Sequence, residues 1–368
     1  MATSPLRRAA RPVARRVGAA LTRRWPPHSH LFLVGEGAGW VIDHELRALG
    51  DTARRLGLAV ADPRLLRGAS GQSAFYGSQF TLLAGAWSPP PHRLGVAYFH
   101  GRPGTPGMPE FDACYRSLCE HHEELRRVQV SHSELEAVVL GSGIDPGKVF
   151  RIPIGIEPAY FGPQTRESKA AARAELGLPA GAFVVGSFQK DGVGFGEGLE
   201  PKPIKGPDVL VEALRLLRMQ VADLHVLLAG PARGYVRAGL ERLGIPYRHR
   251  ELERYDRIGG LYQALDAYVV PARQEGGPKG VLEAMASGVP VVTTRVGQAM
   301  DLVRHGENAW LVEVEDAEGL AHWLAHVAGR PSDLPPVVAA GLETAAANTY
   351  EAHLPLWRAF FDGFVEAP

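Results

Sequence analysis

Short apolar runs alternate with longer segments of helical periodicity along most of this chain, and no other feature constrains the fold as strongly. The first apolar run, HLFLV at residues 30–34, leads through the loop GEGAGW to a helical pattern over residues 42–56. Helices that alternate with apolar strands are typical of a parallel sheet, so we expect a parallel α/β unit here. The expected strands of this half are residues 30–34, 57–61, 94–99, 128–131 and 149–155.

The same pattern restarts after Glu157. Helical segments and apolar strands again alternate, and a long glycine-rich loop follows the first of these strands. Two similar α/β halves joined near residue 155 predict two Rossmann-like domains, in which ligands lie beyond the carboxyl ends of the strands. The expected strands of this half are residues 183–188, 225–230, 246–250, 267–271 and 289–293, and the expected helices are residues 169–176, 208–217, 236–243, 258–265 and 319–327.

The last segment, residues 349–367, has the periodicity of an amphipathic helix with a broad apolar stripe, which must pack on a large surface. The stripe consists of Tyr350, Leu354, Trp357, Phe360 and Phe361. We expect this helix to pack back on the N-terminal domain. The predicted division of the chain is a basic tail at residues 1–28, an N-terminal domain at 29–155, a C-terminal domain at 156–340 and a C-terminal helix at 341–368.

Composition excludes several classes of protein. Apolar residues make up 45% and charged residues 22% of the 368 residues, as in soluble globular proteins. No run of about 18 apolar residues occurs, so we expect no transmembrane helix. The formal net charge is zero, yet the first 30 residues hold seven arginines and no acidic residue. The rest of the chain is therefore acidic by about seven charges, which argues against a nucleic-acid groove.

The two cysteines, Cys114 and Cys119, lie five residues apart in a segment of helical pattern. Side chains at this spacing point to different faces of a helix, which disfavours both a disulfide and a shared metal site. The neighbouring His121 and His122 leave a zinc site open as an alternative. The favoured interpretation is a structural helix in a reducing cytoplasm.

The stretch EGGPKGVLEAMASGVP at residues 275–290 joins an apolar strand to a helix. Pro278 suits the first turn of that helix and Gly288 suits its end. Backbone amides near a helix amino terminus favour an anion such as a phosphate. The amides expected there belong to Gly277, Lys279 and Gly280.

Two carboxylates, Glu275 and Glu283, flank this predicted anion site. A phosphate would repel a carboxylate beside it, so these side chains should face neutral groups that donate hydrogen bonds. Sugar hydroxyls meet that requirement. We expect Glu283 to accept from the two hydroxyls of a ribose, and Glu275 to accept from a second sugar across the pyrophosphate.

The Glu-x7-Glu spacing, with GGP inside it and EAMASGVPVVTTRVGQAMDLV behind it, resembles the retaining GT-B glycosyltransferases of the family 4 type, the glycosyl transferases group 1. The resemblance implies an α/β fold of GT-B architecture, with two Rossmann-like domains facing a central cleft and a C-terminal helix that crosses back to the first domain. An ordinary Rossmann turn with surface glutamates is the plainer alternative. The donor-binding residues implied are Gly37, Gly276, Gly277, Pro278, Lys279, Gly280 and Glu283, with Glu275 at the transferred sugar.

Basic residues in the glycine-rich loop at 187–208 fit the same resemblance. Members of the family hold the nucleotide diphosphate with a base after this strand and a lysine before the next helix, which implies these roles for Lys190 and Lys205. Such charges stabilise the departing diphosphate. Because the loop is longer than usual, Lys202 stays open as the partner of Lys205, and solvated loop lysines are the plainer interpretation.

Three features of the first half are weaker indications. The resemblance places His100 near the donor sugar, where it would bond a hydroxyl, and Gly37 at the closest approach to the donor. A catalytic Ser131–His132 pair is disfavoured, because adjacent residues at a strand end point apart. The GEGAGW loop lacks the full dinucleotide-binding spacing, although Asp62 keeps a dehydrogenase open.

The resulting prediction is a retaining glycosyltransferase (hexosyltransferase) with a UDP- or GDP-sugar or similar donor and a glycan, lipid-linked or small-molecule acceptor. Without a convincing covalent nucleophile, same-face displacement is favoured, with Lys190, Lys205, Glu275 and His100 as the catalytic residues. No Asp-x-Asp occurs, and we expect neither a metal nor another cofactor. A catalytically silent sugar-nucleotide-binding module and a UDP-sugar 2-epimerase of the same fold remain alternatives.

The expected location is the cytoplasm. The arginine-rich residues 4–27 form either a disordered leader, a targeting segment, or an amphipathic helix that holds the enzyme at the inner face of a membrane.

Overall fold

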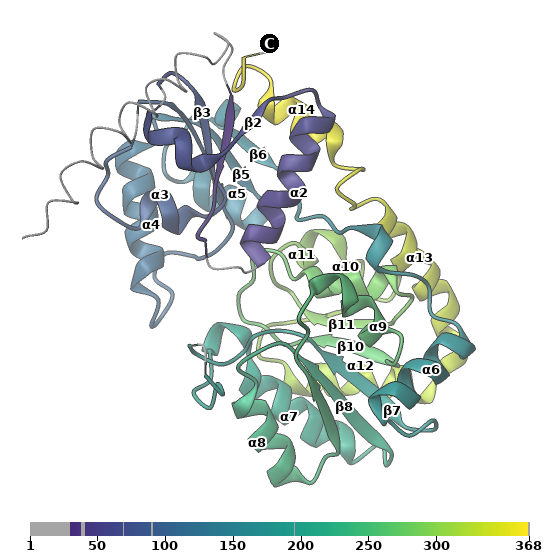
Figure 1. Ribbon diagram of the computed structural model, residues 1–368. Coiled ribbons are helices and arrows are strands. Elements are labelled where there is room, and N and C mark those ends of the chain that lie inside the picture. Colours follow the sequence, from purple (N-terminus) through teal and green to yellow (C-terminus); the bar gives the residue numbers. More distant parts are fainter. Residues whose placement is uncertain (1–29, 38–40, 69, 90, 195, 367–368) are drawn as a thin grey trace, which may run out of the picture. The chain divides into compact units, whose positions relative to one another are not determined.

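The computed structural model describes residues 30–37, 41–68, 70–89, 91–194 and 196–366 (Figure 1). The predictions for residues 4–27 therefore lie outside the described part of the chain. Residue contacts divide the chain into two compact units. Within the described residues, unit 1 takes the chain up to Val130, Leu135–Ile152 and the segment from Leu354 onward. Unit 2 takes Ser131–Glu134 and Pro153–His353.

Unit 1 contains a six-stranded parallel sheet in the order β2-β1-β3-β4-β5-β6. Its strands are β1 (Leu31–Val34), β2 (Val60–Ala61), β3 (Ser73–Tyr76), β4 (Arg93–Tyr98), β5 (Leu125–Val130) and β6 (Val149–Arg151), and its helices include α2 (Val41–Arg55), α3 (Gln79–Leu83), α4 (Pro109–His121) and α5 (Ser133–Leu140), the last beginning in residues grouped with unit 2. Strand β3, with the sequence SAFY, was not predicted.

The C-terminal helix α14 (Leu354–Phe361) completes unit 1. The ring of Phe360 lies 5.5 Å from that of Phe75 and 5.3 Å from that of Phe150, both edge-on. Ser73 Oγ donates to the carbonyl of Phe364 at 2.6 Å. The predicted return of this helix to the first domain is confirmed, because its aromatic face supplies core that the short strands lack.

Unit 2 contains a second six-stranded parallel sheet, in the order β12-β11-β10-β7-β8-β9. Its strands are β7 (Phe183–Ser187), β8 (Leu224–Ala229), β9 (Tyr247–Arg250), β10 (Ala267–Val270), β11 (Val291–Thr294) and β12 (Trp310–Val312). Its helices are α6 (Arg166–Leu176), α7 (Pro207–Arg218), α8 (Gly234–Leu243), α9 (Ile258–Tyr262), α10 (Lys279–Ala286), α11 (Ala299–Leu302), α12 (Ala317–Gly329) and α13 (Leu334–Ala346). The predicted α/β fold with two Rossmann-like sheets is confirmed.

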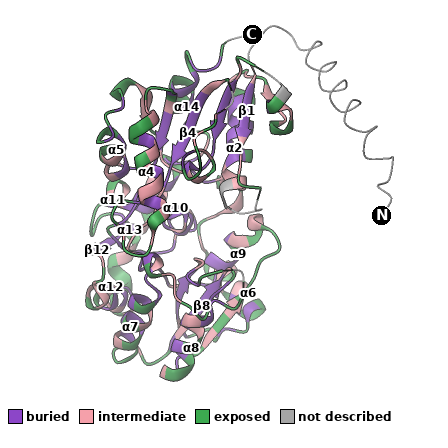
Figure 2. Cartoon of the chain, turned by 90° about the vertical axis from the view of Figure 1, so that its left-hand side faces the viewer, coloured by how far each residue is buried: buried purple, intermediate pink, exposed green. Residues whose placement is uncertain are grey.

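Burial follows from this layering. Strands β10 and β11 are buried along their whole lengths, as expected where helices cover both faces of a parallel sheet. Figure 2 shows the buried positions concentrated in strands such as β1, β4 and β8, with exposed positions on the outer faces of the helices. None of the described helices is both long and apolar enough to cross a membrane.

The C-terminal part of unit 2 differs from the predicted boundaries. Helix α13 was not predicted, and Ala345 belongs to the same buried cluster as Met285 of α10. Residues 341–353, expected in the returning helix, therefore lie with unit 2, and α14 begins only at Leu354. Pro355 explains the late start, because proline is tolerated in the first turn of a helix but not in its interior.

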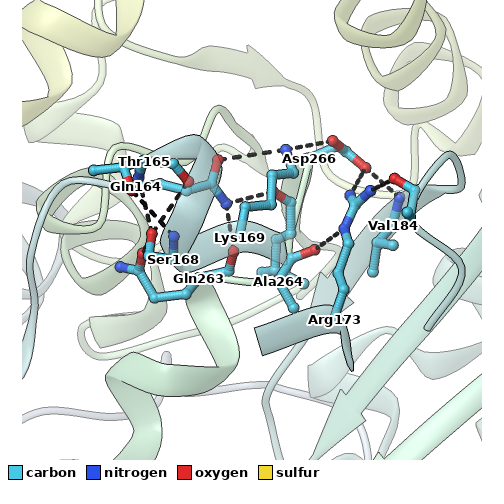
Figure 3. A network of polar contacts seen from close by, with 11 residues as sticks. Gln164, Thr165, Ser168, Lys169, Arg173, Val184, Gln263, Ala264 and Asp266 are labelled. Atoms are coloured by element: carbon cyan, nitrogen blue, oxygen red, sulfur yellow. Dashed lines mark hydrogen bonds and ion pairs between the residues drawn. The ribbon is translucent and has the colours of Figure 1, made fainter. Parts of the chain in front are cut away.

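A charged network stabilises the amino ends of the central strands of unit 2 (Figure 3). Asp266, directly before β10, lies 2.6 Å from Lys169 Nζ and 2.5 Å from Arg173 Nη2, both on α6. It also accepts from the Val184 amide of β7 at 2.6 Å. We call Asp266, Lys169 and Arg173 the amino-edge network.

Candidate functional site

The strand order of unit 2 locates the candidate site. Strands β7, β8 and β9 run outward in one direction, and the chain then returns to place β10 on the other side of β7. At such a switch point the loops that follow the two central strands separate, and ligands bind in the crevice beyond their carboxyl ends. The loops in question are residues 188–206 after β7 and residues 271–278 after β10.

Backbone hydrogen bonds tie these two loops together at the 3-10 turn η4 (Pro203–Lys205). The amides of Arg273 and Gln274 donate to the Ile204 carbonyl at 2.8 and 3.0 Å. Gln189 Nε2 donates to the Lys205 carbonyl at 2.9 Å. The main chain at Lys205 is therefore fixed from both sides.

Two neighbouring residues, Gly206 and Arg273, allow the two loops to meet at η4. Gly206 has a φ of +62°, and a Cβ there would lie 2.0 Å from the Pro271 carbonyl oxygen, so only glycine fits. The Arg273 guanidinium bonds both carboxylate oxygens of Asp208, at 2.8 and 2.7 Å, and the Pro203 carbonyl at 2.8 Å. These hydrogen bonds lower the pKa of Asp208. Arg273 was not predicted as a site residue, since its only signal is a position after a strand.

The junction brings two of the predicted residues into contact. Lys205 Nζ lies 2.6 Å from Glu275 Oε2, with side-chain exposures of 17% and 8%. The sequence placed Lys205 on a diphosphate and Glu275 on a sugar, but did not predict this ion pair. An ammonium and a carboxylate side by side offer one partner for a phosphate oxygen and another for a hydroxyl.

The long loop between Lys190 and Lys205 is closed at its base. The Lys202 amide donates to the Asp191 carbonyl at 2.7 Å, and Gly192 pairs with Pro201 in an antiparallel bridge. The backbone of Asp191, next to Lys190, is therefore adjacent to that of Lys202. Burial lowers the pKa of the Lys190 ammonium.

The residue that follows Lys190 in the sequence, Asp191, forms a fully buried ion pair. Arg233 lies 3.0 Å from the Asp191 carboxylate, and both side chains are inaccessible to solvent. Arg233 also donates to Ser187 Oγ at 3.1 Å and to the Ala229 carbonyl at 3.0 Å, at the ends of β7 and β8. Burial raises the pKa of Asp191, and the Arg233 charge counteracts this. Sequence reasoning missed this pair, whose only signals are a charge next to Lys190 and another after β8.

Glu283, in the second turn of α10, is 3% exposed. Its Oε2 accepts from the Tyr262 hydroxyl at 2.8 Å, and its Oε1 accepts from the Tyr255 hydroxyl. Burial, and then the Glu283 charge, raise the pKa of Tyr262 well above its ordinary value. Neither tyrosine was predicted as a site residue. Tyr262 lies in the helix predicted over residues 258–265, and Tyr255 lies in the turn before it.

The glycines of the EGGPKG turn have packing reasons beyond ligand approach. A Cβ at Gly277 would lie 2.7 Å from Ile154 Cδ1, and one at Gly280 would lie 2.3 Å from the Tyr268 hydroxyl. The Gly276 carbonyl accepts a hydrogen bond. Pro278 is the residue before α10 and not part of its first turn as predicted, and it has no side-chain acceptor for the helix amides.

Lys279 is buried at the start of α10, with an exposure of 8%. Its ammonium donates to the Tyr350 hydroxyl at 3.0 Å and lies 5.0 Å from the centre of the Tyr255 ring. A cation over an aromatic face is an attractive contact. Tyr350 was predicted on the apolar stripe of the C-terminal helix. That prediction is wrong, because Tyr350 lies before α14 and bonds Lys279 in unit 2.

The other two predicted residues, His100 and Gly37, belong to unit 1. The buried side chain of Gln79 accepts from the Phe99 amide at 3.1 Å and donates to the His100 carbonyl at 2.5 Å, which fixes the backbone after β4. Gly37 has a φ of +69°, and its amide lies 3.4 Å from Asp43 Oδ1. A carboxylate at this amide disfavours a phosphate there.

Two adjacent residues depart from the prediction. Ser131 Oγ lies 3.0 Å from His132 Nδ1, so the side chains do not point apart. The Ser131 hydroxyl donates to the Gly276 carbonyl at 2.5 Å and is therefore held as a structural donor.

The alternatives for the cysteines and for Asp62 can also be placed. Both cysteines are free, and burial raises the pKa of Cys114 to about 12. Among the described residues, no group of three or more His, Cys, Asp or Glu is arranged to hold a metal ion. The Asp62 carboxylate is bonded by Arg64.

The chain is similar to known proteins over both units. Residues 191–329 match the family described as Glycosyl transferases group 1. D-inositol 3-phosphate glycosyltransferase of Mycolicibacterium gilvum is 33% identical over 209 residues, covering 54% of this chain and 43% of that protein. The corresponding enzyme of Corynebacterium urealyticum is 29% identical over 230 residues, covering 58% and 51%. This chain thus spans about half the length of the curated relatives it matches.

A solved structure, Anabaena Alr3699/HepE in complex with UDP and glucose, superposes with a TM-score of 0.72 at 17% identity, covering 91% of this chain and 99% of that one. The fold, with two α/β units that each contain a six-stranded parallel sheet, is that of GT-B proteins.

Proposed function

We propose that this chain, whose residues 191–329 form a domain of the glycosyl transferases group 1 family on a GT-B fold, transfers a sugar from a nucleoside diphosphate sugar to an acceptor hydroxyl with retention of configuration. The Lys205–Glu275 pair carries the proposal, since it lies at the switch point of unit 2 and combines a cation with a hydroxyl acceptor. A UDP-sugar is the first donor to test, because Alr3699/HepE was solved with UDP.

The donor-side roles follow from charge. Lys205 exchanges its bond to Glu275 for a phosphate oxygen, and Glu275 then accepts from hydroxyls of the transferred sugar. Lys190, at the base of the same loop, and the amides that open α10 (Gly277, Lys279 and Gly280) neutralise the diphosphate as it leaves. Glu283 accepts from ribose hydroxyls.

Retention follows in this proposal from same-face displacement. The acceptor hydroxyl attacks on the side from which the diphosphate departs, and a phosphate oxygen takes its proton. The C–O bond to the diphosphate breaks as the new glycosidic bond forms, so donor and acceptor exchange one proton and one sugar. Negative charge builds on the diphosphate as the C–O bond breaks, so positive side chains near it stabilise the transition state more than the bound donor and lower the barrier.

Two residues of unit 1 are proposed to contribute. His100 would bond a hydroxyl of the donor sugar, and Gly37 would allow close approach of a neutral sugar, since Asp43 disfavours a phosphate there. The acceptor is a carbohydrate or lipid-linked hydroxyl. Residues 4–27 are proposed to hold the enzyme at anionic lipid, which flotation of the full chain and of a chain starting at His28 would test.

Donor turnover separates the proposal from its alternatives. Purified protein is screened by thermal shift against UDP, GDP, ADP and dTDP, and then incubated with the matching sugar nucleotides while the products are followed by NMR. The proposal expects release of the diphosphate and a sugar product of unchanged anomeric configuration. Binding without turnover indicates a silent module, an epimerised sugar nucleotide indicates an epimerase, and inverted product rejects retention.

A further inference from the structure

The two tyrosines on Glu283 differ in how firmly they are held. Tyr262 is wholly buried in α9, with its ring 4.9 Å from Phe188 and 5.2 Å from Tyr268. Its bond to Oε2 is therefore a fixed part of the core. It holds the carboxylate in one orientation.

Tyr255 has a different setting. It opens the three-residue 3-10 turn η5 (Tyr255–Arg257), after four exposed residues at 251–254, and its side chain is only half-buried. Its ring packs edge-on to Tyr160 at 6.1 Å and faces the Lys279 ammonium. These contacts leave the ring partly exposed, so the hydroxyl, which bonds Glu283 Oε1, can leave that carboxylate when the ring and the η5 turn move together.

We infer that the Tyr255 hydroxyl occupies on Glu283 the position of a ribose hydroxyl and is displaced when the nucleotide binds. The inference rests on the proposed function, in which Glu283 accepts from the ribose. Ribose binding then exchanges one hydrogen bond for another at Oε1. The ribose hydroxyl therefore contributes less binding free energy than it would at a carboxylate oxygen with no tyrosine to displace. Tyr255 thereby sets both donor affinity and the selectivity for ribose over a sugar that lacks these hydroxyls.

Tyr255→Phe removes the competing hydroxyl and keeps the ring that contacts Lys279 and Tyr160. We expect UDP to bind about fivefold more tightly, the factor that corresponds to one ordinary hydrogen bond. The affinity for 2′,3′-dideoxyuridine diphosphate should not change, because that probe has no hydroxyl to compete. Both Kd values are measured by calorimetry on the full chain.

Tyr262→Phe is the matched control, since it removes the other hydroxyl from the same carboxylate. Loss of a fixed partner should weaken UDP binding about fivefold, opposite in sign to Tyr255→Phe. Thermal unfolding of each variant shows whether it is folded. Amide hydrogen exchange supplies a second measurement: UDP, but not the dideoxy probe, should speed exchange in residues 251–257 of the wild-type chain.

Unchanged or weaker UDP binding by folded Tyr255→Phe overturns the inference and leaves the proposed function standing. Equal tightening for UDP and the dideoxy probe also overturns it, because the effect would not depend on the ribose. Failure of the wild-type chain to bind UDP or any other nucleoside diphosphate in the screen rejects the proposed function, and the inference with it.

Discussion

Two of the ion-pair sites of unit 2 lie at opposite ends of the strands of one sheet and are built differently. At the amino edge, the Asp266 carboxylate is bonded by two cations and a backbone amide, which joins α6 to strands β7 and β10 (Figure 3). At the carboxyl edge, Glu275 pairs with Lys205 across two loops. The first arrangement satisfies its carboxylate within the fold. The second keeps a cation and an anion together until substrate groups bind, and these groups are proposed to replace each as the partner of the other.

The comparison predicts that the two sites affect different measurements. A pair that belongs to the fold should change stability and leave chemistry intact. A pair that serves the reaction should change turnover more than stability.

Lys205→Ala should lower kcat by about 100- to 1,000-fold, the range found when one group that stabilises transition-state charge is removed. Lys202→Ala, in the same loop, is the matched control and should reduce kcat much less. Steady-state kinetics with the donor identified in the screen measure both. A larger loss at Lys202 than at Lys205 would transfer the role to Lys202.

Arg173→Ala should destabilise the protein by about 2–4 kcal/mol, because it leaves a partly buried carboxylate with fewer partners. The Lys169 contact keeps the loss below that of an isolated buried charge. Arg215→Ala, which breaks an exposed pair with Glu212, is the control and should cost less than about 1 kcal/mol. Urea unfolding measures both. A normal kcat in folded Arg173→Ala supports the division, whereas a stable variant with lost turnover contradicts it.

Glu283→Ala should weaken UDP binding by about 1.5–3 kcal/mol, because a carboxylate bonded to hydroxyls is lost. Glu275→Ala should reduce turnover more than affinity, since its proposed partner is the transferred sugar. Calorimetry with UDP and kinetics with the sugar nucleotide separate the two. If UDP binds both variants as tightly as wild type and turnover is unchanged, the assignment of both carboxylates is wrong.

Sequence patterns named residues at the carboxyl ends of the unit 2 strands and none at the amino ends. Glu275, Glu283 and Lys205 belong to a local pattern of strand, glycines and helix, and their partners are implied by resemblance. Asp266 and Arg173 are 93 residues apart, and no local pattern pairs them. Strands β3 and β12 and helix α13 were also missed. Helix α13 packs in two clusters, through Ala345 with Met285 of α10 and through Val337 with Trp310 and Leu324, and no local pattern indicates these partners.

Tertiary contacts also decided which predicted residues lie together. The tyrosines that bond Glu283 come from η5 and α9, and Tyr350 reaches Lys279 from beyond α13. Sequence periodicity instead put Tyr350 on the last helix. A pattern within one element predicts that element, whereas side chains from different elements meet according to topology.

His353 is a buried polar group with few hydrogen bonds to offset its removal from water. It is 4% exposed, its Nε2 lies 3.3 Å from Asn348 Oδ1, and burial lowers its pKa to about 4. In the unfolded chain this histidine takes up a proton near pH 6.5. Its contribution to the free energy of unfolding is therefore fully present above that pH and is lost as the pH falls toward 4. We expect a loss of about 2 kcal/mol between pH 7 and pH 5 from this residue.

Urea unfolding at the two pH values tests this contribution. His353→Gln should be less stable at pH 7 yet lose about 2 kcal/mol less than the wild type between pH 7 and pH 5. Equal pH dependence in the two proteins would assign the acid sensitivity to other groups.

The smallest expected effect is none: turnover should persist in EDTA. In the proposed mechanism Lys190, Lys205 and the amides at the start of α10 neutralise the charge of the leaving diphosphate, so no step requires a metal ion. The control is Lys205→Ala in the presence and absence of manganese, because a bound cation would partly replace a missing ammonium. Loss of wild-type turnover in chelator, restored by manganese or magnesium, would assign that charge to a metal and reduce the Lys205–Glu275 pair to positioning the donor.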